Sequence, residues 1–126
     1  MTTGRLAILL AALLACTPPS SVNPSHNANV ITRDEITASH AYNAYDVVAL
    51  LRPNFLQSHG QNTISGTDTG FPKVYLNHQF YGDLESLRTF QVNGIREIHY
   101  YNGTEASNRF GLGNVSGAIE IITDAS

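Results

Sequence analysis

The sequence predicts a small α+β domain, because segments typical of strands and segments typical of helices both occur along the chain. Three segments have the alternating or β-branched composition of strands: Lys73 to Leu76, Ile95 to Tyr101 and Ala118 to Thr123. Two others start with residues that favour a helix N-terminus, Thr32 and Asn43. We therefore expect a small β-sheet with short flanking helices.

Both predicted helices carry further signals. Glu35 follows Thr32 by three residues, so its side chain can reach back to the N-cap backbone and complete a capping box. After Asn43, apolar residues recur at helical spacing as far as Leu51. Pro53 then ends or bends this helix, because proline lacks an N–H and disfavours a helical conformation at the residue before it.

A β-hairpin is predicted where the strand Lys73 to Leu76 is followed by Gln79 to Tyr81. The two residues between them, Asn77 and His78, tolerate the positive φ that a tight hairpin turn needs. Earlier in the chain, residues 30 and 31 are expected to form a short strand or an extended entry to the domain.

The longest predicted strand begins at Ile95 and ends at Tyr101. Side chains alternate between the two faces of a strand. Ile98 is therefore expected to share one face with Tyr100, and Ile95 the opposite face with His99 and Tyr101. A short helix is expected next, over residues 104–107.

Two loops are predicted from composition. Ser58 to Phe71 is polar, contains three glycines and has no apolar face to bury, so it is interpreted as a mobile loop. Gly111 to Gly117 is also glycine-rich, but it leaves a short helix and enters a strand. A dinucleotide-binding loop has the spacing G-x-G-x-x-G and opens a helix, so we expect a turn with positive φ and no phosphate site.

The N-terminal segment is typical of an exported protein. A positive residue, Arg5, precedes the apolar run Leu6 to Leu14, which is too short to cross a bilayer as a helix. Cys16, the one cysteine of the chain, follows Ala15 directly. This arrangement resembles a bacterial lipoprotein signal, which implies that residues 1–15 are removed and that Cys16 is lipidated.

The alternative is that Cys16 is a buried or free thiol. A single cysteine has no partner for an internal disulfide, and a free thiol in an oxidising compartment would be a liability, so lipidation is favoured. Acyl chains such as palmitate would then hold the protein at a membrane surface. Residues 16–29 are expected to form a flexible tether, and residues 30–126 one folded domain.

Composition argues against several classes of function. The chain has a formal net charge of −3 and no basic run, so nucleic acid is not an expected partner. Its five histidines are scattered, and neither a metal nor another cofactor is expected. Asp83 and Glu85 could be a carboxylate pair, but they are better explained as charges at the start of a short helix. No Gly-x-Ser-x-Gly motif occurs, and the chain is not expected to be an enzyme.

The candidates for recognition are four tyrosines, Tyr75, Tyr81, Tyr100 and Tyr101. Tyrosine combines a large contact area with a polar hydroxyl, so exposed members of such a set commonly form a binding surface. At least half of them are expected to be core residues in so small a domain. Those that remain exposed are the expected contacts of a ligand or protein partner.

Three segments together resemble the plug domain of TonB-dependent outer-membrane receptors: Val74 to Gln79, Ile95 to Gly103, and Phe110-Gly111 leading through Gly117 to Thr123. Members of that family typically have a strand ending in a turn, a strand of Ile-Glu-x-Ile-Glu type, a short helix, and a glycine-led strand that ends in threonine. Order and spacing both fit over residues 30–124. The resemblance implies a plug-like α+β fold with a small mixed sheet and a place in the bacterial envelope.

The chain also departs from the family pattern. Asn77-His78 replaces the usual Asp-Gly of the hairpin, and Gly103-Thr104 replaces Gly-Pro. An energy-coupling segment is not recognisable between Thr17 and Asn29, and the sequence stops at Ser126, where a receptor would continue into a barrel. We therefore expect a plug-like domain without a barrel of its own, and no active transport by this chain alone.

Two functional hypotheses follow. The first is a non-catalytic binding or interaction module, lipid-anchored at the outer membrane and facing the periplasm, that docks onto a barrel, an envelope protein or a small ligand. Thr17 supports the outer membrane, because a signal for inner-membrane retention would be acidic at that position in some bacteria. The alternative is a component of TonB-dependent transport, either a truncated receptor or a plug that gates a separate barrel.

Overall fold

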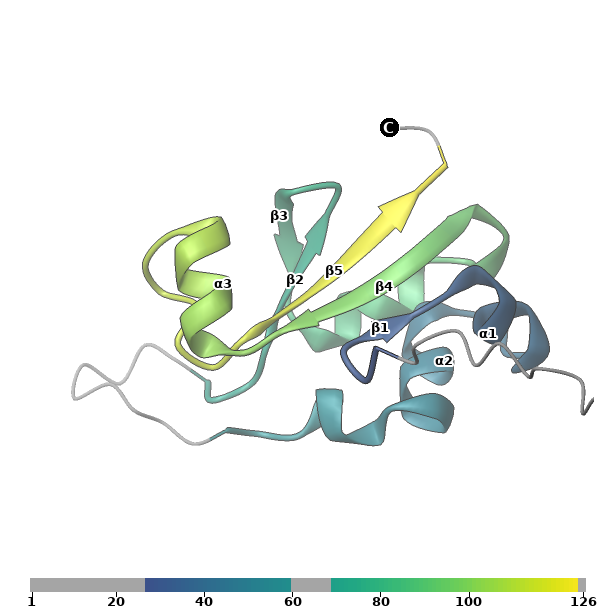
Figure 1. Cartoon of the computed structure of the whole chain (residues 1–126), viewed down its shortest axis with the longest axis horizontal. Coiled ribbons are helices and arrows are strands. Elements are labelled where there is room, and N and C mark those ends of the chain that lie inside the picture. The colour runs from purple at the N-terminus through teal and green to yellow at the C-terminus, as the bar shows by residue number, and fades with distance from the viewer. Residues whose placement is uncertain (1–26, 60–68, 125–126) are drawn as a thin grey trace, which may run out of the picture.

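The computed structural model describes residues 27–59 and 69–124, and five strands in this part of the chain form one sheet (Figure 1). They are β1 (Val30–Ile31), β2 (Lys73–Leu76), β3 (Gln79–Gly82), β4 (Ile95–Tyr101) and β5 (Ala118–Thr123). The order across the sheet is β1-β4-β5-β2-β3. The central strand β5 runs parallel to β2 and antiparallel to β4, so the sheet is mixed. The predicted α+β class is confirmed.

Helices pack on both faces of the sheet. One face carries α1 (Arg33–Ala38), α2 (Ala44–Leu51) and the 3₁₀ helices η1 (Pro53–Leu56) and η2 (Leu84–Thr89). The other face carries α3 (Gly103–Phe110). A further 3₁₀ helix, η3 (Val92–Gly94), leads into β4. In Figure 1, α3 lies toward the end of the sheet where β4 ends and β5 begins.

The main core lies between the sheet and the helices of the first face. Phe55 of η1 and Leu87 of η2 are fully buried there, together with Ile98, Ile119 and Ile121 of the sheet. Each fully buried side chain of this size stabilises the fold by roughly 1.5–3 kcal/mol relative to an exposed one. Most of the apolar burial of the domain is therefore on the side away from α3.

A smaller cluster lies under α3. Tyr75 of β2 is buried there, with its ring stacked on Phe110 at a centroid distance of 3.9 Å. Its hydroxyl donates a hydrogen bond of 2.8 Å to Asn114 Oδ1, in the loop after α3. Both contacts hold α3 and the following loop against the sheet.

Both predicted helix caps are confirmed. The Thr32 side chain accepts a hydrogen bond from the Glu35 N–H, and the Glu35 carboxylate accepts one of 2.9 Å from the Thr32 N–H. The Asn43 side chain accepts a hydrogen bond of 3.0 Å from the Asp46 N–H. As predicted, α2 ends before Pro53, which starts η1 instead.

The predicted hairpin turns on Asn77 and His78, whose φ angles are 45° and 73°. Two successive residues with positive φ match the right-handed twist of the flanking strands. Asn77 also ties the turn to the end of β5: its amide donates to Thr123 Oγ1 at 2.9 Å, and its Oδ1 accepts from the Thr123 N–H at 3.1 Å. The hairpin turn is therefore fixed relative to the central strand.

One face prediction for β4 is wrong. Ile95, expected on the face of Tyr101, lies in the main core with Ile98. The pairing of β4 with β5 shifts register between Ile95 and Glu97, and such a bulge interrupts the alternation of side chains. From Ile98 onward the alternation is as predicted, with Tyr100 against the main core and Tyr101 on the α3 side.

The helix α3 is longer than predicted. Asn102 caps it by accepting a hydrogen bond of 3.0 Å from the Glu105 N–H, and the Glu105 carboxylate accepts one of 3.1 Å from the Asn102 N–H. Gly111 ends the helix with a φ of 93°. Gly113 and Gly117 also have positive φ, as predicted for this glycine-rich loop.

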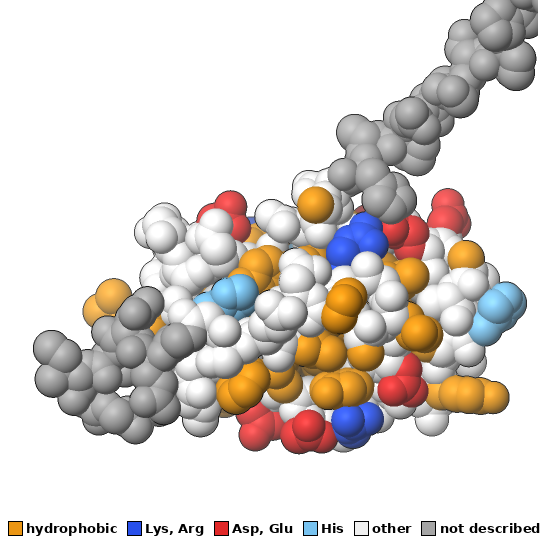
Figure 2. Space-filling view, turned by 90° about the horizontal axis from the view of Figure 1, so that it is seen from below, with side chains coloured by type: hydrophobic (Ala, Val, Ile, Leu, Met, Phe, Trp, Pro, Cys, Tyr) orange, Lys and Arg blue, Asp and Glu red, His pale blue; other side chains and the backbone are white. Residues whose placement is uncertain are grey.

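Hydrophobic side chains are also exposed on the face that carries α2. Figure 2 shows them gathered near the middle of this face, with acidic side chains at its upper and lower edges. Leu50 of α2 and Phe71 before β2 are both exposed. This surface is partly apolar and separate from the α3 side of the sheet.

Several predictions concern residues outside the described ranges. They are the signal segment 1–15, Cys16, most of the tether 16–29 and most of the loop Ser58 to Phe71. Within residues 27–59 and 69–124, no helix combines the length and the apolar character needed to cross a membrane.

Candidate binding site

A fully buried glutamate lies in the central strand. Glu120 stands in β5 between Ile119 and Ile121, which point into the main core, whereas the side chain of Glu120 contacts Arg109 of α3. This side chain has no exposed surface. Burial of a carboxylate is costly unless hydrogen bonds and an opposite charge compensate. The stability of the sheet therefore depends on the groups that form hydrogen bonds with the Glu120 carboxylate.

Four hydrogen-bonding groups surround the Glu120 carboxylate. Oε1 accepts a hydrogen bond of 2.9 Å from the His78 N–H and lies 2.9 Å from His78 Nδ1. Oε2 accepts one of 3.0 Å from the Tyr101 hydroxyl and one of 3.3 Å from Arg109 Nε. The hairpin turn, β4 and α3, which are distant in sequence, thus meet at one buried charge.

His78 and Arg109 also contact each other. Arg109 Nη2 lies 2.5 Å from His78 Nε2. A guanidinium has only donors, so Nε2 is the acceptor, and the proton of a neutral His78 is then on Nδ1, facing Glu120 Oε1. With its proton on Nδ1, His78 donates to Glu120 and accepts from Arg109, so each of these three side chains has a hydrogen-bond partner.

Tyr101 links Glu120 to a second histidine. Burial, together with the hydrogen bond to Glu120 and the charge of that carboxylate, raises the pKa of Tyr101 to about 12. The hydroxyl therefore keeps its proton and serves as a donor. It also lies 3.5 Å from His99 Nδ1, and His99 Nε2 lies 2.7 Å from Glu97 Oε2. We call these side chains the polar cluster: His78, Glu97, His99, Tyr101, Arg109 and Glu120.

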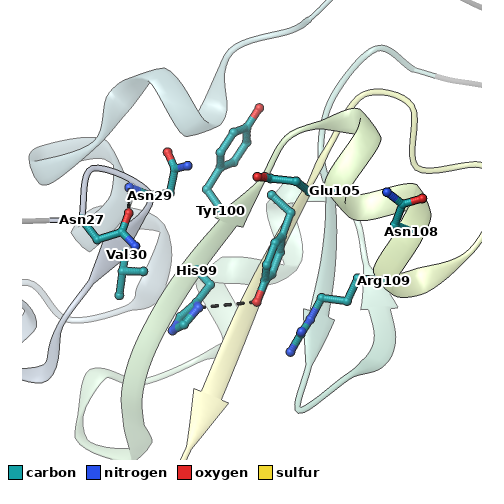
Figure 3. Close-up of a pocket in the computed structure, with 9 residues that line it drawn as sticks. Asn27, Asn29, Val30, His99, Tyr100, Glu105, Asn108 and Arg109 are labelled. Carbon is teal, nitrogen blue, oxygen red and sulfur yellow. Dashed lines mark hydrogen bonds between the residues drawn. The ribbon is translucent and has the colours of Figure 1, made fainter.

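An open cleft of about 510 Å³ lies beside the polar cluster (Figure 3). Three surfaces form it: β4 through His99, Tyr100 and Tyr101, α3 through Glu105, Asn108 and Arg109, and the chain before and within β1 through Asn27, Asn29 and Val30. Small-molecule sites commonly have volumes of roughly 300–1,000 Å³. The cleft is thus large enough for a small ligand.

Glu105 gives this cleft a negative charge. Its Oε2 belongs to the capping box of α3, and its side chain makes no other hydrogen bond within the described residues. Figure 3 shows the carboxylate extending from α3 toward Tyr100 and Asn29 on the other side of the cleft. Burial, and then the charge of Glu105, raise the pKa of Tyr100.

The structure separates the four predicted tyrosines. Tyr100 and Tyr101 both line the cleft. Tyr75 is buried under α3, and Tyr81 is exposed on β3. Two of the four candidates therefore come together, and the other two do not contribute to the cleft.

Asp83 and Glu85 lie at the start of a short helix, as predicted. Asp83 precedes η2, and Glu85 in its first turn lies 2.8 Å from Arg88 Nε. In the part of the chain that the structure describes, no three histidine, cysteine or acidic side chains are grouped so that they could hold a metal ion.

Of the residues of this site, sequence reasoning proposed Tyr100 and Tyr101 alone, and it missed the charged residues Glu105, Arg109 and Glu120. A signal for Glu120 is present, since it is the single charge in the run Ala118 to Thr123. On a sheet with one solvated face, that position is expected to be exposed. Only the packing of α3 on this face, with Arg109 and Tyr101, turns it into a buried position.

No protein-family model matches this chain, and no match is found among curated proteins or solved structures. The chemistry of the site therefore follows from its geometry. The polar cluster fixes donors and acceptors beside the cleft and offers them to a small ligand.

Proposed function

We propose that this protein is a lipid-anchored, plug-like binding or interaction module of the bacterial outer membrane, facing the periplasm and without catalytic activity. The observation that carries the proposal is the placement of the three segments on which the plug resemblance rests. They supply β2 with its turn, β4 and β5, and β5 lies between the other two in one sheet. Segments that resembled the family motifs only by chance would have no reason to become neighbouring strands of one sheet.

The cleft supports the binding half of this proposal. It holds two of the four tyrosines selected as recognition residues, Tyr100 and Tyr101, and places them next to polar side chains of α3. Tyr101, His78 and Arg109 each donate a hydrogen bond to the buried Glu120, so this part of the floor of the cleft is preorganised. A preorganised floor lowers the entropic cost of holding a ligand.

Strand β3 supports the interaction half. It is an edge strand of the sheet, and its residues Gln79, Phe80 and Tyr81 are exposed. Edge strands are commonly protected by charged residues or proline, and β3 contains neither. A partner that offers an extended strand, such as an outer-membrane barrel or another envelope protein, can add to this edge by backbone hydrogen bonds.

The membrane part of the proposal is tested through Cys16. We would express the full chain, Cys16→Ala and the control Thr17→Ala in a Gram-negative host, supply a labelled fatty acid and separate the two membranes. We expect label and outer-membrane recovery for the parent chain and for Thr17→Ala, and neither for Cys16→Ala. Unlabelled, soluble protein from all three would refute the anchor.

The interaction part is tested by photocrosslinking in the same cells. A photoreactive residue at Phe80 of β3 is compared with one at Leu112, which is 99% exposed in the loop after α3. We expect an outer-membrane or envelope protein to be crosslinked from position 80 and not from position 112. Equal yields from both positions would contradict docking at β3. A captured barrel whose uptake fails without this chain would favour the transport alternative.

A further inference from the structure

We propose that the cleft between α3 and residues 27–30 binds a small organic cation, with its primary ammonium group against Glu105. This inference rests on the proposed binding role of the domain and names the chemistry of the ligand. It follows from the charges around the cleft, from the hydrogen-bonding groups left without partners there, and from the size of the cleft.

Glu105 has no ionic partner among the described residues. Glu105 and Arg109 are four residues apart on α3, a spacing at which a glutamate and an arginine commonly pair. Here Arg109 turns the other way, with Nε at 3.3 Å from Glu120 and Nη2 at 2.5 Å from His78. A buried carboxylate gains more from the guanidinium than an exposed one does, because solvent screens the exposed charge.

Because Arg109 pairs with Glu120 and not with Glu105, the cleft keeps the negative charge of Glu105. Arg109 is the one lysine or arginine among the described lining residues, and its charge already balances Glu120. Among the described residues, Glu105 therefore has no cation to pair with. An anionic ligand would have to approach this carboxylate, so the cleft disfavours anions.

The N-terminus of α3 would on its own favour an anion. Asn102 and Glu105 already occupy it as a capping box, through hydrogen bonds of 3.0 Å and 3.1 Å. That box uses Oε2 of Glu105. The other oxygen, Oε1, remains to accept a hydrogen bond from a ligand.

The cleft also supplies hydrogen-bond acceptors. An ammonium group has three N–H donors and no acceptor. The side-chain amides of Asn29 and Asn108 line the cleft and make no hydrogen bond within the described residues. Figure 3 shows Asn29 and Tyr100 across the cleft from Glu105, so an amide group, which can turn its oxygen toward a ligand, and an aromatic ring accompany the carboxylate. A volume of about 510 Å³ leaves room for the body of the amine.

The test is a titration of the full chain in mild detergent at neutral pH, followed by amide NMR shifts. The probes are benzylamine, benzyl alcohol and benzoate, which have nearly the same shape and carry a positive, no and a negative charge. We expect saturable shifts around Asn29, Glu105 and Asn108 with benzylamine, and binding at least about tenfold weaker for the other two probes. Equal binding of benzyl alcohol, tighter binding of benzoate or no binding of benzylamine would each overturn the inference.

Matched variants assign the charge to Glu105. Glu105→Gln keeps the capping box, because glutamine also serves at this helix position. We expect it to weaken benzylamine at least about tenfold, with the remaining amide shifts unchanged. Glu85→Gln removes an exposed carboxylate of η2, outside the cleft, and should leave binding unaltered. Wild-type affinity in Glu105→Gln would overturn the inference.

Lipid labelling at Cys16 and crosslinking at Phe80 do not involve the cleft. A failure of the cation test is therefore distinct from a failure of the proposed function.

Discussion

The Tyr101 hydroxyl donates a hydrogen bond of 3.0 Å to Glu120 Oε2 and thereby joins two neighbouring strands on the α3 side of the sheet. In the pairing of β4 with β5, Tyr101 stands opposite Ala118, and His99 stands opposite Glu120. Tyr101 therefore reaches diagonally across the sheet, as long side chains can. The buried charge at the centre of the sheet is held by an adjacent strand as well as by α3.

Tyr101→Phe removes this donor and keeps the ring. We expect the free energy of unfolding to fall by roughly 1–3 kcal/mol, because one lone pair of a buried carboxylate is left unsatisfied. Urea denaturation measures the change. The control is Tyr81→Phe, whose hydroxyl lies 3.4 Å from Thr89 Oγ1 at an exposed position and should matter by less than about 0.5 kcal/mol. Equal losses for both variants would contradict the role given to Tyr101.

Arg109→Met tests the charge balance of Glu120. The Arg109 side chain is 36% exposed, so we expect a loss of about 2 kcal/mol, less than the 3–5 kcal/mol of a fully buried broken pair. The control Arg33→Met breaks an exposed pair with Asp124 and should cost about 0–1 kcal/mol. Thermodynamic coupling is measured by adding Glu120→Gln to Arg109→Met. Strictly additive losses would show that the two side chains do not interact.

Local signals in the sequence were sufficient where a few neighbouring residues decide the structure. The capping residues Thr32 and Asn43 start their helices as predicted, and the turn Asn77-His78 has the expected positive φ values. In each case the hydrogen bonds or dihedral angles involve residues close in sequence.

Features that depend on distant packing were missed. Ile95 changes face because of a bulge against β5, and Glu120 is buried because α3 packs on its side of the sheet. The cleft requires residues 27–30, β4 and α3 to meet, which no local pattern specifies. Tyr100 and Tyr101 were among the candidate residues and line this cleft, whereas their charged neighbours Glu105 and Arg109 were not proposed.

The lowered pKa of Glu35 predicts how the stability of the fold depends on pH. Although burial raises its pKa, hydrogen bonds from the Thr32 backbone and from Arg52, together with the charge of Arg52, lower it below its usual value of 4.5. A carboxyl group with a lowered pKa in the folded state contributes stability above its unfolded pKa and loses it as the pH falls through the folded pKa. The contribution of Glu35 is therefore present at neutral pH and disappears in acid.

Glu35→Gln measures this contribution, because glutamine can keep the capping box with Thr32 while losing the charge that faces Arg52 at 3.0 Å. We expect the variant to be less stable than the parent chain at pH 7, by about 1 kcal/mol for this partly exposed pair, and the difference to shrink below pH 4.5. Thermal unfolding over a pH series gives both values. A difference that stays constant into acid, or one matched by Glu85→Gln, would argue against the ion pair as its source.

Gly103 and Gly94 offer a matched pair of substitutions to alanine. At Gly103, the first residue of α3, a Cβ would lie 2.0 Å from the Val115 carbonyl oxygen and 2.8 Å from its carbon. Backbone cannot give way as a side chain does, so the loop after α3 must shift. At Gly94, just before β4, a Cβ would meet nothing within 4 Å.

We expect Gly103→Ala to lower the free energy of unfolding by about 1–3 kcal/mol or more, measured by denaturation, and Gly94→Ala to be neutral or slightly stabilising. Because α3 forms one wall of the cleft, Gly103→Ala should also move the amide signals of Glu105 and Asn108, and unchanged signals would show that the contact with Val115 does not position this helix.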